Sequence, residues 1–146
     1  MELIASVGRG PLALDSAIFI YFIEQHPRYV SVLRPLFKKI DHGDVLAVTS
    51  ALTLLETLVV PYRAGDRDLA ARYETILTRG QGLTLAPIDQ PILRLAAEIR
   101  AATSVRTADA LQLATALATK CRAFLTNDRR LPVLPGLTVL QLESFA

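Results

Sequence analysis

Short apolar runs alternate with longer segments of mixed polarity along nearly the whole chain. A short apolar run bounded by turn residues is typical of a buried strand, whereas apolar residues spaced three and four apart indicate an amphipathic helix. The pattern predicts strands over residues 12–14, 45–48, 83–86, 123–125 and 137–140. It predicts helices over residues 16–25, 30–40, 50–60 and 66–78, from 89 onward, and over 107–120.

Polar and turn-forming residues mark the expected helix ends. Asp66 and Asp89 each stand just before a helical pattern, where a side-chain oxygen can accept a hydrogen bond from a free backbone N–H. Ser16 and Thr107 are placed in the same way and are also predicted to be caps. Pro61 lies within an otherwise helical pattern, so we expect it to kink or end that helix.

The alternation of strands and helices predicts the fold class. Strands separated by helices form βαβ units, which build a mostly parallel sheet with helices on both faces. We therefore expect an α/β fold, a three-layer α/β/α sandwich around a mostly parallel central sheet. No internal repeat or linker divides the sequence, so residues 1–146 are expected to form a single domain. In such sheets, ligands bind beyond the carboxyl ends of the strands.

Composition and charge narrow the class of protein further. The chain of 146 residues is 51% apolar and 21% charged, which suits a globular domain with a substantial core. Its single cysteine excludes an intrachain disulfide and favours a reducing compartment. The N-terminus does not resemble a signal peptide, and no apolar region is long enough to span a bilayer, so we expect a cytoplasmic protein without a membrane partner. A net charge of +2 does not by itself indicate nucleic-acid binding.

Four acidic residues stand out among the fourteen. Asp15 follows the first predicted strand and Asp128 follows the fourth, so both lie at carboxyl ends of strands. Glu56 lies in a helix that is apolar nearly all round, which predicts that this helix is substantially buried. Asp109 lies in the first turn of a helix of small apolar residues, where free backbone N–H groups favour its charged form.

Taken singly, these acids have structural explanations. Asp15 can be a helix cap and Asp109 a favourable first-turn acid. Asp128 can be a turn residue, whereas Glu56 would need a cationic partner in the core. Taken together, they predict a pocket in which four carboxylates converge within reach of one cation. Like charges in one pocket raise one another's pKa unless a cation holds them.

The chemistry of such a pocket indicates a hard divalent cation. Carboxylate oxygens and water are the ligands that Mg²⁺ and Mn²⁺ prefer. His26 and His42 fall in turn-like segments away from these acids, which argues against zinc. Carboxylates that hold one or two Mg²⁺ ions are the usual arrangement for phosphodiester hydrolysis.

Three polar residues adjoin the proposed ligands. Thr107 lies just before Asp109, and Thr126 and Asn127 lie just before Asp128. These side chains are candidates to orient a carboxylate or a water molecule. Capping and turning the backbone would explain them as well.

The segments that carry the four acids are LALDSAIFIYFIE, TSALTLLETLV, RTADALQLATAL and AFLTNDRRL, in that order. These segments resemble the PIN-domain ribonucleases, and the similarity extends from the first predicted strand to the fourth. The chain is most similar to the VapC-type toxins of toxin–antitoxin pairs. The resemblance implies that Asp15, Glu56, Asp109 and Asp128 are the catalytic and metal-binding residues of an endoribonuclease that depends on Mg²⁺ or Mn²⁺. It also implies a homodimer and a cognate antitoxin that blocks the site.

A site that cuts RNA needs cations near its acids to hold phosphates. Arg106 lies close to Asp109 in the sequence, and Arg129 and Arg130 follow Asp128, so these arginines are candidate phosphate contacts. Solvent exposure or ion pairs would explain them equally well. The few aromatic residues fall mostly in core-like segments, so we expect no platform for stacking bases.

Three other functions remain open at this point. A PIN-domain nuclease can process RNA outside a toxin–antitoxin pair. A module of the same fold can bind a partner without catalysis. A phosphatase or phosphoacceptor domain would use Asp15 as the nucleophile, but such domains usually place a second acid beside it and a lysine near the site.

Overall fold

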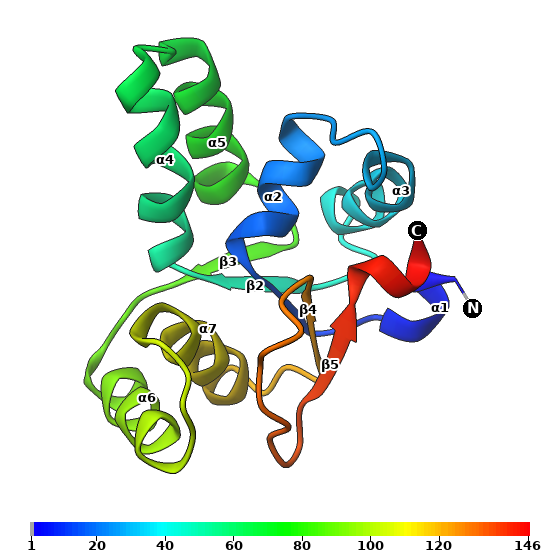
Figure 1. The fold of residues 1–146 in the computed structure, drawn as a ribbon. Coiled ribbons are helices and arrows are strands. Elements are labelled where there is room, and N and C mark those ends of the chain that lie inside the picture. The colour runs from blue at the N-terminus through cyan, green and yellow to red at the C-terminus, as the bar shows by residue number, and fades with distance from the viewer. Residues whose placement is uncertain (1) are drawn as a thin grey trace.

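The computed structural model describes residues 2–146 and shows an α/β fold built on one parallel sheet (Figure 1). The sheet has five strands in the order β3-β2-β1-β4-β5, and every neighbouring pair is parallel. The strands are β1 (Leu12–Leu14), β2 (Ala47–Ser50), β3 (Leu83–Ala86), β4 (Ala123–Thr126) and β5 (Thr138–Gln141). The predicted fold class is therefore confirmed.

Helices cover both faces of this sheet (Figure 1). α6 and α7 lie on one face, and α2, α3 and α5 lie on the other. The helices are α1 (Leu3–Val7), α2 (Ser16–Ile23), α3 (Val30–Asp41), α4 (Leu52–Ala64), α5 (Arg67–Arg79), α6 (Gln90–Ala102) and α7 (Thr107–Ala118), followed by the 3₁₀ turn η1 (Leu142–Phe145). Within residues 2–146, no helix has the length and apolar character that crossing a lipid bilayer requires.

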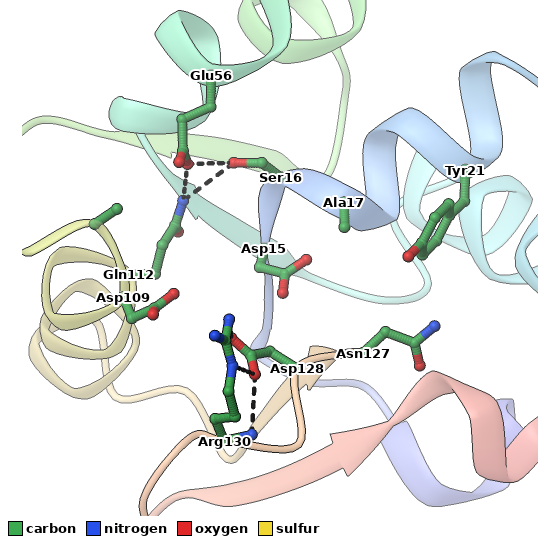
Figure 2. Close-up of a pocket in the computed structure, with 11 residues that line it drawn as sticks. Asp15, Ser16, Ala17, Tyr21, Glu56, Asp109, Gln112, Asn127, Asp128 and Arg130 are labelled. Carbon is green, nitrogen blue, oxygen red and sulfur yellow. Dashed lines mark hydrogen bonds and ion pairs between the residues drawn. The ribbon is translucent and has the colours of Figure 1, made fainter. Parts of the chain in front are cut away.

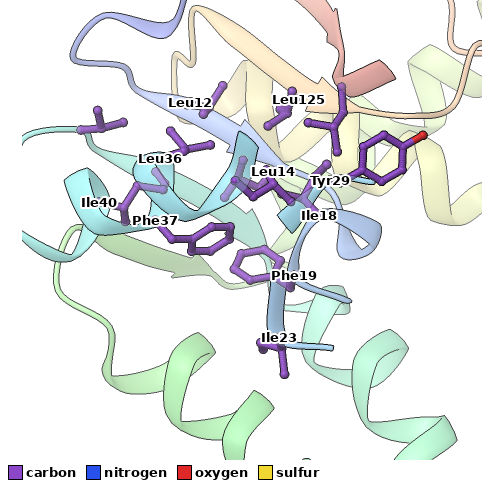
Figure 3. Close-up of a cluster of buried hydrophobic side chains, with 14 of the residues drawn as sticks. Leu12, Leu14, Ile18, Phe19, Ile23, Tyr29, Leu36, Phe37, Ile40 and Leu125 are labelled. Atoms are coloured by element: carbon purple, nitrogen blue, oxygen red, sulfur yellow. The ribbon is translucent and has the colours of Figure 1, made fainter. Parts of the chain in front are cut away.

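The two faces of the sheet have cores of different character. Leu12 and Leu14 of β1 point to one face, where they pack with large side chains from α2 and α3 such as Phe19 and Phe37 (Figure 3). Ala13 points to the opposite face, whose cluster is rich in alanine from α6 and α7. This alternation along β1 is the period of a strand that is covered on both sides. Asp15, the next residue, therefore lies just beyond the carboxyl end of β1, the central strand.

The strand pairing shifts one predicted strand by two residues. The apolar run predicts a strand over 45–48, but β2 begins at Ala47, which pairs with Leu12 of β1. Its last residues, Thr49 and Ser50, are polar and buried. The Thr49 hydroxyl satisfies its hydrogen bonding by donating to the Leu14 carbonyl oxygen at 2.7 Å. Apolarity alone could not reveal this, because a buried hydroxyl is stable when it has a partner.

Two of the predicted helix caps are confirmed and two are wrong. Asp66 and Asp89 accept hydrogen bonds at 3.1 Å from the backbone N–H groups of the third residue along their helices. Ser16 and Thr107 are instead the first helical residues of α2 and α7. Their hydroxyl groups take part in side-chain contacts with other helices or segments, and those contacts replace the capping bond.

α4 differs from its prediction in where it ends and in how far it is buried. The helix continues through Pro61 to Ala64 and ends at Gly65, whose φ of 66° is a left-handed conformation that favours glycine. Proline removes only one backbone donor, and here it lies in the last turn of the helix. The helix is also less buried than predicted, because Leu55, Val60 and Tyr62 are 61%, 66% and 61% exposed. Large apolar side chains of α4 therefore lie on the surface.

The short helix α1 was not predicted. It has only five residues, which is too short for a helical period to show in the sequence. Leu3 and Val7 lie one turn apart and are both buried in the core cluster that includes α3.

Candidate functional site

A cavity of about 450 Å³ opens beyond the carboxyl ends of β1 and β4, and it brings the four predicted acids together (Figure 2). Asp15 directly follows β1, and Asp128 comes shortly after β4. Glu56 reaches the cavity from α4, and Asp109 from the first turn of α7. The parallel topology explains the meeting, because β1 and β4 are neighbours and their carboxyl ends share one edge of the sheet.

Asp15 is the most perturbed of these acids. The Thr126 hydroxyl donates a hydrogen bond to its Oδ2, whereas its Oδ1 is buried and has no hydrogen-bond partner. Burial raises the pKa of Asp15 to about 6, although the hydrogen bond from Thr126 and the backbone N–H groups of Ile18 and Ala17 act to lower it. A buried carboxylate oxygen without a partner is costly.

Thr126 links the two strand ends. Its hydroxyl donates to Asp15 and also accepts a hydrogen bond from the backbone N–H of Asp128 at 3.0 Å. Thr126 is fully buried, so packing fixes the direction of both bonds. The contact with Asp15 is what an orienting role requires, and the contact with the Asp128 backbone is what a turn role requires, so both interpretations of Thr126 stand.

Neutral groups surround Glu56. The Ser16 hydroxyl donates to Glu56 Oε1 at 2.6 Å, and Gln112 Nε2 lies 3.4 Å from the same oxygen (Figure 2). Gln112 also donates to the buried Thr53 hydroxyl at 2.9 Å. The cationic partner that a buried Glu56 would need is absent from the contacts of this side chain, because hydroxyl and amide donors take its place.

Asp109 is half-buried beside the other acids. Burial and the charge of Asp128 raise its pKa, while the cations Arg130 and Arg106 act in the opposite direction. The net effect disfavours the charged form of Asp109 relative to a carboxyl in water.

Asp128 has its own cation. Arg130 donates from Nε to Oδ1 at 3.0 Å and from Nη2 to Oδ2 at 3.2 Å, and its backbone N–H donates to Oδ1 at 2.9 Å. The guanidinium group beside Asp128 lowers the pKa of that carboxyl. Arg130, predicted as a phosphate contact, therefore lies in the cavity wall and forms an ion pair there.

The remaining predicted residues lie in different places. Asn127 lines the cavity, but its Oδ1 accepts a hydrogen bond from the Glu143 backbone N–H at 2.9 Å. Thr107 does not line the cavity, and its hydroxyl accepts from Arg100 at 3.0 Å. Arg106 and Arg129 are exposed and do not line the cavity either.

Comparison with known proteins places the chain in a family. A family model of the PIN domain matches residues 12–137. The chain belongs to the PIN-domain family. No curated protein matches it. PIN domains are a family of nucleases and generally use divalent metal ions.

Solved structures of similar fold come from bacterial complexes. The first is VapBC2 from Rickettsia felis bound to a DNA fragment of its promoter, with a TM-score of 0.68 and 18% identity over 89% of this chain and 97% of that chain. A DNA-bound VapBC from Salmonella typhimurium has a TM-score of 0.65 and 20% identity over 90% and 97%. A toxin–antitoxin complex from Klebsiella pneumoniae has a TM-score of 0.65 and 18% identity over 87% and 95%. These likenesses support the PIN fold.

The acids of this PIN domain share a cavity but do not form a ready-made ion cage. Across residues 2–146, no three His, Cys, Asp or Glu side chains are grouped closely enough to hold a metal ion as they stand. The expected convergence is therefore only partial, since Ser16 and Gln112 hold Glu56 while Arg130 holds Asp128. The residues nevertheless fit a hard cation in chemistry, because the unpartnered Asp15 oxygen belongs to a cavity lined by three further carboxylates.

Sequence analysis missed several residues that shape the PIN-domain cavity. Ser16 was interpreted as a helix cap, and Gln112 and Thr53 had no assigned role. A buried polar residue in an apolar helix was the available signal for Gln112, because it needs partners. Tyr21 also lines the cavity. The centre of its ring lies 5.0 Å from that of His26 and 4.9 Å from that of Tyr29, so one aromatic cluster does border the site.

Proposed function

We propose that this PIN-domain protein is a divalent-metal-dependent endoribonuclease and the toxin of a toxin–antitoxin pair. One observation carries the proposal: Asp15 lines a cavity together with three other carboxylates, and one of its carboxylate oxygens is buried without a hydrogen-bond partner. A cation would relieve the cost of this arrangement more fully than any group in the cavity does.

In this proposal Asp15, Glu56, Asp109 and Asp128 hold Mg²⁺ or Mn²⁺. When bound, such an ion activates water and stabilises the charge that develops on the phosphate. Thr126 keeps Asp15 turned toward the cavity. Ser16 and Gln112 keep Glu56 in place, so its carboxylate stays within the cavity even without an ion.

The arginines supply positive charge for a polyanionic substrate. Arg130 lies in the cavity wall, and Arg106 is close enough to Asp109 and Asp128 to lower the pKa of both. Arginine suits phosphate because its fork of donors matches two phosphate oxygens. We assign RNA as the substrate class, in keeping with the PIN-domain resemblance.

The toxin role rests on two supports. Similar folds occur in complexes titled VapBC and toxin–antitoxin. In this chain, α4, the helix that also carries Glu56, exposes Leu55 and Tyr62 on one face and Val60 on another. Large exposed apolar side chains mark surfaces for protein partners. An antitoxin that covers Val60, which lies one helical turn after Glu56, would lie next to the cavity, and a homodimer contact is a further part of the proposal.

The phosphoacceptor alternative has less support. Such a domain would need a lysine close to Asp15, and none of the residues that line the cavity is a lysine. An RNA-processing nuclease outside a toxin–antitoxin pair would use the same site, so the genomic neighbourhood distinguishes it. A short upstream reading frame that encodes a DNA-binding segment would support the toxin, and its absence would favour RNA processing.

Cleavage of RNA in the presence and absence of chelator tests the activity. We expect cleavage of a mixed pool of single-stranded RNAs with Mg²⁺ or Mn²⁺, complete loss with EDTA, and recovery on adding the ion back. Asp15→Asn and Glu56→Gln should each lower the rate by at least about 100-fold. The exposed acids Asp68 and Glu98 provide matched controls, and Asp68→Asn and Glu98→Gln should retain full activity. Cleavage that survives EDTA would contradict the proposal.

Mass measurement in solution tests the assembly. Light scattering on the purified chain should give twice the monomer mass, and co-expression with the upstream product should yield a stable complex without RNA cleavage. A monomer would remove the homodimer from the proposal but leave the nuclease intact.

A further inference from the structure

The ion pair between Asp128 and Arg130 engages both carboxylate oxygens of a proposed metal ligand. Oδ1 accepts two hydrogen bonds, from the Arg130 backbone N–H at 2.9 Å and from Nε at 3.0 Å. Oδ2 accepts from Nη2 at 3.2 Å. A carboxylate oxygen has about two favourable acceptor directions, so Oδ1 has none left in this arrangement. Asp128 therefore cannot bind a cation through Oδ1 while Arg130 stays where it is.

A divalent cation and the guanidinium group would also repel each other. Arg130 contributes to lowering the pKa of Asp109 as well as that of Asp128, so its charge reaches two of the four proposed ligands. A second cation placed among the same carboxylates meets that charge within a few ångströms, where repulsion is strong. Binding of the ion and retention of the Arg130 contact are therefore in competition.

We propose that Arg130 is an internal counter-cation, which a divalent ion displaces from Asp128 and which then becomes free to hold a phosphate of the substrate. This inference rests on the proposed metal-dependent nuclease function and names the residue that couples metal binding to substrate binding. In the metal-free protein, the guanidinium group neutralises one carboxylate of the cavity. In the loaded protein, the same group faces the cavity unpaired.

The exposure of the two side chains makes this exchange inexpensive. The Arg130 side chain is 73% exposed, and that of Asp128 is 22% exposed. An ion pair with an exposed partner contributes little stability because water replaces its hydrogen bonds readily. The Asp15 contact with buried Thr126 offers no such freedom, so the exchange is confined to the Asp128 side of the cavity.

The released guanidinium group stays close to the reaction. Its backbone follows Asp128 by two residues, so the side chain remains tethered at the cavity wall. An unpaired guanidinium group beside a bound divalent ion is a suitable phosphate site, since it offers forked donors and the ion neutralises the acids. Metal binding should thus raise affinity for RNA through Arg130, and by linkage RNA should raise affinity for the metal by the same factor.

Mn²⁺ titration of the full chain by calorimetry, without RNA, tests whether the ion and Arg130 compete for Asp128. We expect Arg130→Gln to bind Mn²⁺ about three- to ten-fold more tightly than the unaltered protein, because Asp128 then keeps only the backbone N–H of residue 130 and loses its cation. Arg129→Gln is the matched control. It removes the same unit of charge from the adjacent residue, whose side chain forms no hydrogen bond or ion pair with Asp128, and the Mn²⁺ affinity of this variant should change less than two-fold. Arg130→Lys retains the charge but loses the fork, so its affinity should lie between.

Equal or weaker Mn²⁺ binding by Arg130→Gln, relative to Arg129→Gln, would overturn the inference. Weaker binding would show that Arg130 positions Asp128 for the ion. If Arg130→Gln does not fold, Arg130→Lys carries the test, with tighter binding than the unaltered protein as the required result. Failure of the unaltered chain to bind Mn²⁺ at all would instead overturn the proposed function itself, so the two failures are distinguishable.

Nuclear magnetic resonance tests the displacement directly. In the ¹⁵N-labelled protein, addition of diamagnetic Mg²⁺ should shift the Arg130 Nε–H signal and speed its exchange with water, while the Arg129 signal stays constant.

RNA binding tests whether the released Arg130 holds a phosphate. A 2′-O-methyl RNA that cannot be cleaved should bind more tightly with Mg²⁺ than without it. Arg130→Gln should lose most of this gain, and Arg129→Gln should keep it. An Arg130 signal that does not respond to Mg²⁺, or an equal gain in both variants, would contradict the exchange.

Discussion

The two walls of the cavity treat their carboxylates differently. On the wall built by β1, α2, α4 and α7, only neutral donors contact Asp15 and Glu56. On the wall that follows β4, the guanidinium group of Arg130 donates hydrogen bonds to both carboxylate oxygens of Asp128. The pKa of Asp15 is raised to about 6, whereas that of Asp128 is lowered. The cost of removing a carboxylate from water is therefore concentrated on the first wall, and this is where an added cation would stabilise the protein most.

The difference follows from where each acid leaves the sheet. Asp15 lies at the end of the central strand and enters α2 at once, so the elements packed on both faces of the sheet partly bury it. Asp128 lies on the connection between β4 and β5, near the edge of the sheet, where a long arginine can reach it from solvent. Burial without a cation and exposure with a cation are the two ways in which this fold accommodates an acid.

Removing the charge of Asp15 should give the largest change in stability. The unfolded chain releases this proton near the ordinary value of 3.8, whereas the folded protein releases it at about 6, so folding favours the protonated form. The stability that this proton supplies is complete below about pH 4 and is lost as the pH rises through 6. Metal-free Asp15→Asn should therefore be about 2–3 kcal/mol more stable than the unaltered protein at neutral pH, with almost no gain at about pH 4.

Urea unfolding at several pH values in EDTA measures this change. Excess Mn²⁺ should reverse the order at neutral pH, because only the unaltered protein then gains the free energy of metal binding. A gain that is the same at all pH values would show that the charge of Asp15 is not its cause.

Breaking the link between the walls should give the next largest effect. Thr126→Val removes the hydroxyl that serves Asp15 and the Asp128 backbone, so we expect a loss of about 1–3 kcal/mol in the free energy of unfolding. Mn²⁺ affinity should fall about 10-fold or more because the carboxylate loses its orientation. Thr138→Val, at an exposed position of β5, is the matched control and should change neither quantity measurably.

Disturbing the neutral donors around Glu56 should have a smaller effect. Gln112→Leu removes the amide that contacts Thr53 and Glu56, and we expect a loss of about 1–2 kcal/mol in stability and a few-fold weaker Mn²⁺ binding. Exposed Gln81→Leu is the control. An unchanged Mn²⁺ affinity in Gln112→Leu would mean that Ser16 alone suffices to hold Glu56.

Neutralising Asp128 should change stability least. Its pKa is lowered, so its contribution is present above the ordinary value of 3.8 and is lost as the pH falls through the lowered value. The sign is thus opposite to that for Asp15. Because Arg130 is largely exposed, Asp128→Asn should destabilise the metal-free protein by less than about 1 kcal/mol at neutral pH, measured by the same urea titrations. A larger loss would show that this wall is not the weakly held one.

The sequence by itself determined the α/β class and the placement of the acids. Apolar periods of two and of three to four are local properties, so they predict strands and helices without knowledge of the contacts. Asp15 and Asp128 follow strands that parallel pairing brings together, which is why four separate segments predicted one site. The four acids do line one cavity, and their role in binding metal remains a prediction.

Only the tertiary structure decided what each side chain contacts. Ser16 had the position of a helix cap, but Glu56 from a distant helix offered its hydroxyl a stronger, charged acceptor. The exposure of Leu55 on α4 depended on which helices pack against it, which no local period contains. The same holds for the charges: whether an acid has no cation beside it, like Asp15, or forms an ion pair, like Asp128, depends on neighbours that the fold alone brings within a few ångströms.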